Sequence, residues 1–180
     1  MKKMRPDFIG HYTDFEQPDD AHYPGSNEIL AQGYPVGKKL GLKKIGIHIE
    51  VIAPGRRTSW PHAEKEEEEF AYVIEGRPCV WIDGKTYELQ PGDFVAFPSG
   101  TGICHTFLNN TETEVKLLVG GEASKPENKI FYPLHPKRNA QMREKGWLWE
   151  DFPGGEMGDH DGLPDRLRES DADSSSKSSN

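Results

Sequence analysis

Two features of membrane and secreted proteins are missing from this sequence. No apolar run approaches the roughly 20 residues of a membrane-spanning helix, and no apolar signal core follows the basic start at residues 1–7. The two cysteines, Cys79 and Cys104, are too few for the disulfide framework of a small secreted domain. Their spacing is not that of a metal-ligand pair either. These absences predict a cytoplasmic protein with no membrane partner.

A basic surface stripe is also lacking. The formal net charge is −8, and residues 150–180 alone hold nine acidic and three basic side chains, so the rest of the chain is nearly neutral. Nucleic acids and anionic membranes are bound by clusters of Lys and Arg, so neither is a predicted partner. Only 34% of the residues are hydrophobic and the mean hydropathy is −0.78, which suits one core rather than two.

Long helical periodicity and internal repeats are absent from the sequence, and short extended segments take their place. Residues 44–52 alternate, with aliphatic side chains on one face and His48 and Glu50 on the other. Asp83-Gly84 is a strong signal for a two-residue type I′ turn between two strands. Further strands are predicted at residues 70–75, 78–82, 85–89, 94–97, 103–107 and 115–119. This pattern predicts an all-β fold, an antiparallel sandwich or barrel.

Histidine and carboxylate residues recur at two places in this predicted sheet. His62 and Glu64 are two residues apart, so their side chains point to the same side if the segment is extended. Glu69 comes directly before a strand-like apolar segment, and six residues separate it from Gly76. Much later, His105 lies inside another predicted strand. The joint spacing includes further turn and strand residues, namely Gly92, Pro98, Gly100 and Asn109.

These segments resemble the two signature motifs of the cupin family, and the likeness extends over residues 44–122. The resemblance implies an antiparallel double-stranded β-helix, or jelly roll, with a metal site inside the barrel formed by His62, Glu64, Glu69 and His105. The sequence departs from the family pattern at Glu64, where a second His usually stands. Glu64 is therefore a fourth metal ligand, a catalytic base, or a residue that hydrogen-bonds a ligand imidazole.

The resemblance extends to small single-domain cupins without an assigned reaction, so it implies no particular chemistry. Two imidazoles with two carboxylates suit Fe(II), Mn(II) or Ni(II), with Zn(II) as an alternative. One hypothesis is a metal-dependent enzyme acting on a small polar substrate, of the dioxygenase or the sugar or keto-acid isomerase type. The other is a non-catalytic module that binds a small-molecule ligand. A fold alone does not decide between them.

Several other residues allow two interpretations. His48 either faces the metal site or lies at the rim of the barrel. The pair Arg56-Arg57 either forms salt bridges or anchors a carboxylate or phosphate group of a substrate. The acidic run at residues 66–68 is predicted to be solvated or at the rim. His135 and His160 are predicted to be surface residues.

The predicted organisation has four parts. An N-terminal arm at residues 1–43 precedes the barrel at 44–122, a C-terminal extension follows at 123–168, and a disordered tail occupies 169–180. Trp147, Trp149 and Phe152 predict that the extension packs on the barrel, with an extended segment near 129–136 and a short helix at 139–145. Sheet edges need covering, and both the arm and the Trp147/Trp149 region carry aromatic residues that could cover them. These segments cover the edges of their own barrel or of a neighbour's, and a homodimer is predicted.

Overall fold

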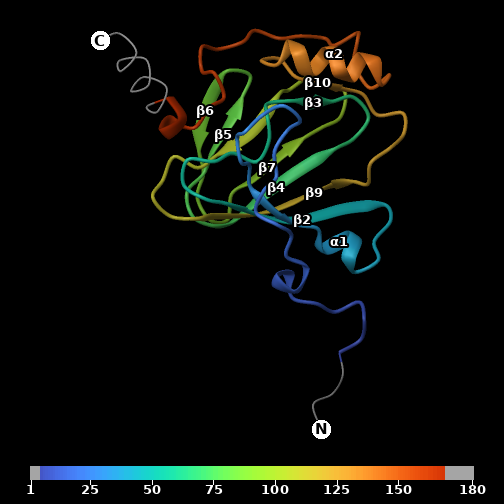
Figure 1. Ribbon diagram of the computed structural model, residues 1–180, viewed down its shortest axis with the longest axis vertical. Coiled ribbons are helices and arrows are strands. Elements are labelled where there is room, and N and C mark those ends of the chain that lie inside the picture. The colour runs from blue at the N-terminus through green and yellow to red at the C-terminus, as the bar shows by residue number, and fades with distance from the viewer. Residues whose placement is uncertain (1–4, 169–180) are drawn as a thin grey trace.

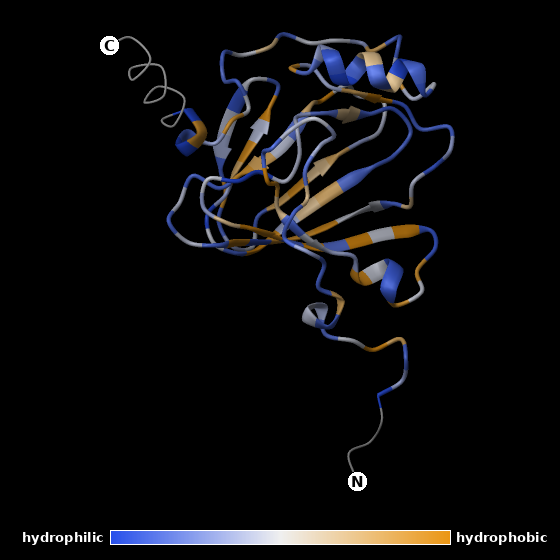
Figure 2. Cartoon of the chain, in the orientation of Figure 1, coloured by the Kyte–Doolittle hydropathy of each residue, from blue (hydrophilic) through white to orange (hydrophobic). Residues whose placement is uncertain are grey.

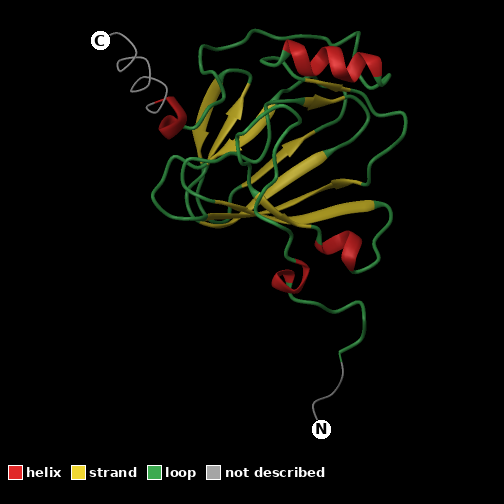
Figure 3. Ribbon diagram, viewed as in Figure 1, coloured by secondary structure: helices red, strands yellow, loops and turns green. Residues whose placement is uncertain are grey.

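Antiparallel strands make up most of the computed structural model, which describes residues 5–168 (Figure 1). The helical elements are short and lie outside the sheets, as Figure 3 shows, and a further helical turn lies at residues 165–168. The strands are β1 (Gln32–Tyr34), β2 (Ile45–Ile52), β3 (Ala63–Glu64), β4 (Glu69–Glu75), β5 (Cys79–Ile82), β6 (Lys85–Glu88), β7 (Phe94–Phe97), β8 (His105–Leu108), β9 (Val115–Glu122) and β10 (Ile130–Phe131). The helical elements are η1 (Tyr12–Phe15), α1 (Val36–Lys39) and α2 (Pro136–Glu144).

Every strand pair in these sheets is antiparallel. A five-stranded sheet has the order β1-β2-β9-β4-β7, a three-stranded sheet has the order β6-β5-β8, and β10 pairs with β3. Isolated bridges join Arg57 to Leu108 and His62 to His105, so the segment between β2 and β4 runs beside β8. The predicted all-β antiparallel barrel is confirmed.

The core lies between the five-stranded and the three-stranded sheets. Alternation along β4 shows how the sequence builds it, because Ala71 and Val73 are buried while Tyr72 and Ile74 are exposed on the outer face. The main cluster comprises Ala31, Ile52, Ala71, Val73, Val80, Phe97, Phe107, Val115 and Leu117. Fully buried aliphatic side chains such as Leu117 each contribute roughly 1.5–3 kcal/mol. One core of this kind agrees with the low hydrophobic content.

The predicted turn at Asp83-Gly84 is present between β5 and β6. Both residues have positive φ, +46° and +80°, which a type I′ turn requires. The C-terminal extension packs against this turn, since Gly158 N–H donates to Asp83 O (2.7 Å) and His160 N–H donates to Gly84 O (3.0 Å). A side chain at position 84 would collide with the backbone of Gly158.

The C-terminal extension contacts the barrel at several points. The predicted extended segment forms β10, and the predicted helix begins at Pro136, since proline is tolerated in the first turn of a helix. Trp149 is buried and Phe152 packs beside it, but Trp147 is 50% exposed, so the packing prediction was wrong for Trp147. In the described part of the chain no helix has the length and apolarity to cross a membrane. The predicted disordered tail, 169–180, lies outside the described residues.

A buried arginine joins three parts of the chain. Arg57 is 1% exposed, and its Nε and Nη2 donate to both carboxylate oxygens of Glu28 at 2.6 and 2.7 Å. Its Nη1 donates to Gly162 O at 2.7 Å. The barrel is thereby tied to the N-terminal arm and to the C-terminal extension, and the salt-bridge interpretation of Arg57 is the one observed.

Candidate metal centre

Two imidazoles face each other across a backbone bridge. His62 N–H donates to His105 O at 3.2 Å and His105 N–H donates to His62 O at 2.9 Å, so the two residues are direct antiparallel partners. Side chains of directly opposed residues lie on the same face of a sheet. The ring centroids are accordingly 5.2 Å apart with 39° between the planes.

Glu69 brings a carboxylate to these two rings from the first residue of β4. Its Oε2 lies 3.2 Å from His105 Nε2 and 3.9 Å from His62 Nε2. One donor atom from each of the three residues lies within 4.8 Å of the others, a grouping of the size that a metal ion requires. Side chains separated by up to 43 positions in the sequence therefore meet at one point.

The backbone sets which nitrogen each imidazole turns toward Glu69. His62 Nδ1 lies 2.8 Å from Trp60 O, and His105 Nδ1 lies 3.4 Å from Ile103 O. A carbonyl oxygen only accepts hydrogen bonds, so Nδ1 carries a proton in each ring, and Nε2 is the nitrogen that is turned toward Glu69. Phe97 stacks on His105 with centroids 3.4 Å apart and planes 5° apart, which restricts rotation of that ring.

The charges at this point fit a cation. Burial, together with the neighbouring His105, lowers the pKa of His62, which favours the neutral form of this ring that binds a metal ion. Burial alone would raise the pKa of Glu69, but the close imidazoles of His105 and His62 outweigh it and lower that pKa to about 2. Glu69 Oε2 is buried and has no hydrogen-bond partner of suitable geometry among the described residues. An ionised buried oxygen left without a partner is costly in a protein interior, and a metal ion would satisfy it.

Glu64, the fourth predicted ligand, lies near this cluster but is not part of the group within 4.8 Å. It occupies β3 opposite Ile130 and lines the small cavity that also contains Glu69 and His105. Burial, followed by the charges of Glu69 and Glu67, raises the pKa of Glu64 to about 8. Its role as a ligand or as a base stays a prediction.

A cavity of about 250 Å³ opens beside the cluster, and carboxylates dominate its wall. It is lined by His48, Glu50, Glu64, Glu67, Glu69 and Glu122, together with Gly46, Val119, Gly120 and Gly121. His48 therefore faces the site region rather than standing apart from it. Glu50 Oε1 lies 3.7 Å from His48 Nδ1, and burial, followed by the charge of Glu69, raises the pKa of Glu50 to about 8.

Glu50 is the residue that sequence reasoning missed. Its signal was the two-residue spacing from His48 in a strand whose other face is aliphatic. That alternation places His48 and Glu50 on the same face, which turns inward in the structure. The sequence did not reveal that this inner face ends at the metal cluster, because that depends on the curvature of the barrel.

Three further residues were expected at the surface or at the rim of the barrel. Glu67, expected with Glu66 and Glu68 to be a surface or rim residue, is 8% exposed, lines the cavity and accepts a hydrogen bond from Lys125 N–H at 2.5 Å. His135 is half-buried and stacks on Trp60 with centroids 4.0 Å apart, and burial lowers its pKa to about 4. His160 is also half-buried, and its backbone carbonyl accepts from Trp81 Nε1 at 2.8 Å. Each of these residues is held by a partner distant in the sequence.

Comparison with known proteins gives a family match and several relatives. Residues 48–121 match the family model described as "Cupin domain". A curated protein from Streptomyces cyaneus, "Polyketide synthase CurC", is 29% identical over 119 residues, which make up 66% of this chain and 70% of that protein.

Solved structures also resemble the chain. A sugar phosphate isomerase from Silicibacter pomeroyi DSS-3 is 30% identical, with a TM-score of 0.55, over 57% of this chain. The likeness spans 64% of that protein, just under two thirds of its length. The polyketide cyclase RemF from Streptomyces resistomycificus is 23% identical, with a TM-score of 0.57, over 81% of this chain and 99% of that one. At this level of identity the second likeness concerns the fold alone.

Proposed function

Since the chain belongs to the cupin superfamily, we propose that it is a divalent-metal-dependent enzyme whose metal is held by His62, Glu69 and His105. The observation that carries the proposal is the meeting of Glu69 Oε2 with His62 Nε2 and His105 Nε2, because these three residues each offer a donor atom within 4.8 Å of the others. Two imidazole nitrogens and a carboxylate suit Fe(II), Mn(II) or Ni(II), and Zn(II) also accepts such donors. Glu64 is the candidate for a further ligand.

The proposed reaction is an acid–base isomerisation of a small polar carbonyl compound. A divalent metal bound here supplies a Lewis acid that polarises the carbonyl group. Glu50 stands on the wall of the adjoining cavity and is not one of the three clustered ligands. Its pKa of about 8 leaves the carboxyl group able both to hold and to release a proton near neutral pH, which suits a general acid–base catalyst. The likeness to a protein named sugar phosphate isomerase supports this type of reaction.

The cavity wall favours an uncharged substrate. The residues of the described chain that line it include five glutamates and neither Lys nor Arg. A phosphate dianion in that cavity would meet negative charge without a bidentate arginine or a lysine to offset it. An uncharged hydroxycarbonyl compound would instead find hydrogen-bonding groups, since protonated carboxyl groups donate and ionised ones accept. About 250 Å³ accommodates a small molecule of this kind.

Metal content is the first test. The full chain, purified without added metal and then loaded in turn with Fe(II), Mn(II), Ni(II) or Zn(II), is expected to retain about one equivalent of at least one of them. His62→Ala and Glu69→Gln remove a donor and should lose the metal. His22→Ala is the matched control, because His22 is exposed and lies in the N-terminal arm. Failure of the wild-type protein to retain any of the four metals, or to gain thermal stability from them, would contradict the metal centre.

Turnover is the second test. Small uncharged hydroxyketones and hydroxyaldehydes are incubated in D₂O, and deuterium incorporation next to the carbonyl is followed by NMR, while oxygen uptake is monitored in parallel. Exchange without oxygen uptake is the expected result, and Glu50→Gln should slow it by about 10²–10⁴-fold while the metal content is unchanged. Oxygen uptake would identify a dioxygenase instead. A metal-loaded protein that binds compounds with unchanged affinity in Glu50→Gln, and converts none, would be a binding module.

A further inference from the structure

A second cavity lies at the start of helix α2, on the side of the barrel that carries β10 and β3 (Figure 1). Its volume is about 410 Å³, and it shares no lining residue with the metal cluster. Its walls include Pro24, Trp60, Leu134, His135, Lys137 and Arg138. Figure 2 shows that α2 is largely hydrophilic, and Met142 is its buried residue. The helix therefore presents polar side chains to this α2 cavity instead of filling it.

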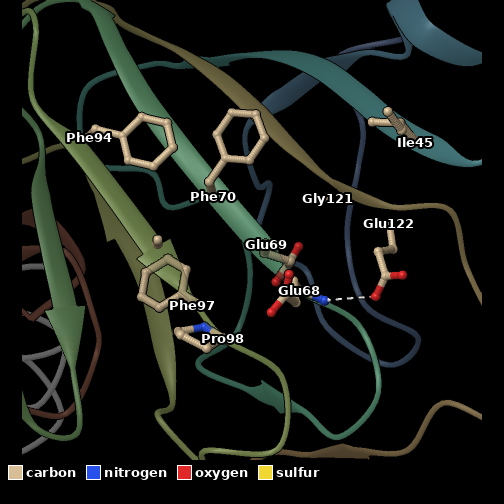
Figure 4. A pocket seen from close by; sticks show the side chains of 10 residues that line it. Ile45, Glu68, Glu69, Phe70, Phe94, Phe97, Pro98, Gly121 and Glu122 are labelled. Atoms are coloured by element: carbon tan, nitrogen blue, oxygen red, sulfur yellow. Dashed lines mark hydrogen bonds between the residues drawn. The ribbon is translucent and has the colours of Figure 1, made fainter.

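The charge of the α2 cavity is opposite to that of the cavities around the metal cluster. Among the described residues, its lining has Lys137 and Arg138 and no Asp or Glu. The groove in Figure 4 is instead lined by Glu68, Glu69 and Glu122, and the cavity beside the metal cluster is lined by five glutamates. Neither of these two linings contains Lys or Arg in the part of the chain that the structure describes. The side chains of the α2 cavity therefore favour an anionic ligand, which the glutamates disfavour.

Two buried nitrogen atoms of this lining, Arg138 Nε and His135 Nε2, have no hydrogen-bond partner among the described residues. Arg138 Nη1 donates to Gln141 Oε1 at 3.1 Å, so the edge of the guanidinium that carries Nε is left for a ligand. That edge suits a bidentate contact with an oxyanion. A buried polar atom without a partner costs free energy, and a bound acceptor would remove that cost.

Aromatic rings hold these polar groups in place. Trp60 stacks with both Tyr23 and His135, with centroids 4.1 and 4.0 Å apart and planes 16° and 10° apart. The guanidinium carbon of Arg138 lies 5.2 Å from the ring centroid of Tyr23 and 5.6 Å from that of Tyr132. Cation–π contacts orient the guanidinium without neutralising its charge. The charge of Arg138 is therefore positioned before a ligand arrives, which lowers the cost of binding.

We propose that the α2 cavity binds a small organic molecule through an anionic group, a carboxylate or a phosphate. The anionic group lies against Arg138 Nε and His135 Nε2, with the exposed Lys137 at the rim. The body of the molecule packs against Pro24 and Leu134. This site does not depend on the proposed reaction, because none of its lining residues belongs to the metal cluster.

NMR of the arginine Nε–H groups tests the site on the metal-free, ¹⁵N-labelled full chain. The resonance of Arg138 is identified by its loss in Arg138→Lys. Inorganic phosphate and butyrate are titrated separately at constant ionic strength, with 1-butanol as the uncharged probe and sodium chloride as the salt control. Saturable shifts of this resonance with phosphate, with butyrate or with both are expected, and they identify which anionic group is bound. Saturation by neither anion, or equal shifts with 1-butanol or chloride, would overturn the proposal.

Substitutions on α2 locate the binding energy. Arg138→Gln should weaken binding of the same anion, followed by backbone amide shifts, about 10–100-fold, as expected for a hydrogen bond to a charged group. Lys137→Gln, at an exposed position that does not endanger folding, should also weaken binding. Arg143→Gln is the matched control, because Arg143 is exposed on the same helix and pairs with Glu150 at 2.8 Å outside the cavity.

Two results would contradict this location. Equal losses in Arg138→Gln and Arg143→Gln would show a general attraction of anions to the helix and no built site. Anion binding that appears only after loading with a divalent metal would place the anion at the metal cluster. Retained anion binding in the metal-free protein supports the α2 cavity even if the proposed metal-dependent reaction is not found.

Discussion

Replacing Glu50 by Gln should make the metal-free protein less sensitive to alkaline pH. The Glu50 side chain is 18% exposed, and its carboxyl group lies in a wall with other carboxylates. Burial and the charge of Glu69 raise its pKa from 4.5 to about 8. The folded protein therefore holds this proton more tightly than the unfolded chain does.

The sign of the effect follows from that difference. The contribution of the protonated carboxyl group is fully present below pH 4.5 and is lost as pH rises through about 8. A rise from 4.5 to about 8 corresponds to at most about 5 kcal/mol, at 1.36 kcal/mol per pH unit. Gln is neutral at every pH, so Glu50→Gln should resemble the wild type near pH 4.5 and exceed its stability by several kcal/mol at pH 9.

The assay is urea unfolding in EDTA at pH 5, 7 and 9, with the free energy of unfolding compared between wild type and variant. Glu88→Gln on β6 is the control, because Glu88 is exposed, and its curve should run parallel to that of the wild type. A constant difference between Glu50→Gln and wild type from pH 5 to 9 would refute the reasoning, since it would mean that Glu50 is not held protonated. Bound metal should shrink the effect, because a nearby cation lowers the pKa of Glu50.

Two further substitutions probe Glu64 and the β5–β6 turn. If Glu64 contacts the metal or supports a ligand, Glu64→Gln should weaken metal binding about 10–100-fold. If Glu64 is a base, the same substitution should leave the metal in place and lower turnover about 10²–10⁴-fold. Metal titration and kinetics on the same sample separate these outcomes, and Glu64→His should keep the metal. Gly84→Ala should cost about 2 kcal/mol or more in urea unfolding, because it combines positive φ with a collision with Gly158. Gly92→Ala, with φ of +100° but open space around it, should lose less, and equal losses would exclude the collision as the cause.

Local signals made most of the fold predictable. The strand predicted at residues 44–52 is observed as Ile45–Ile52. Its alternating pattern and the Pro54-Gly55 pair that ends it both lie within a few neighbouring residues, so local sequence was enough to predict it. The Asp83-Gly84 turn was equally local. The strand predicted at 103–107 is observed as His105–Leu108, a shift at its start, where Gly102 has positive φ and the preceding residues form a loop.

The site was predictable only where spacing carried the information. His62, Glu69 and His105 were identified together from the motif, and the structure brings them together. Glu50 and Glu67 were not identified, because their burial depends on partners remote in sequence, namely the β9 segment and the backbone of Lys125. The four consecutive glutamates at residues 66–69 have the sequence pattern of a solvated surface, and the sequence does not show that Glu67 accepts a hydrogen bond from the backbone amide of Lys125. Contacts between residues that are distant in the sequence do not produce a repeating sequence pattern from which they could be predicted.

Arg57 links the barrel to the N-terminal arm and to the C-terminal extension, so the three parts are expected to be inherited together. The family match spans residues 48–121, yet the partners of this buried guanidinium, Glu28 and Gly162, both lie outside that span. Excising the matched segment would leave a cation in the core without its acceptors, a loss of about 3–5 kcal/mol that a small domain can ill sustain. Recombination with a relative at the borders of the match would create the same defect. Exchange between relatives is therefore expected to carry the arm, the barrel and the extension together.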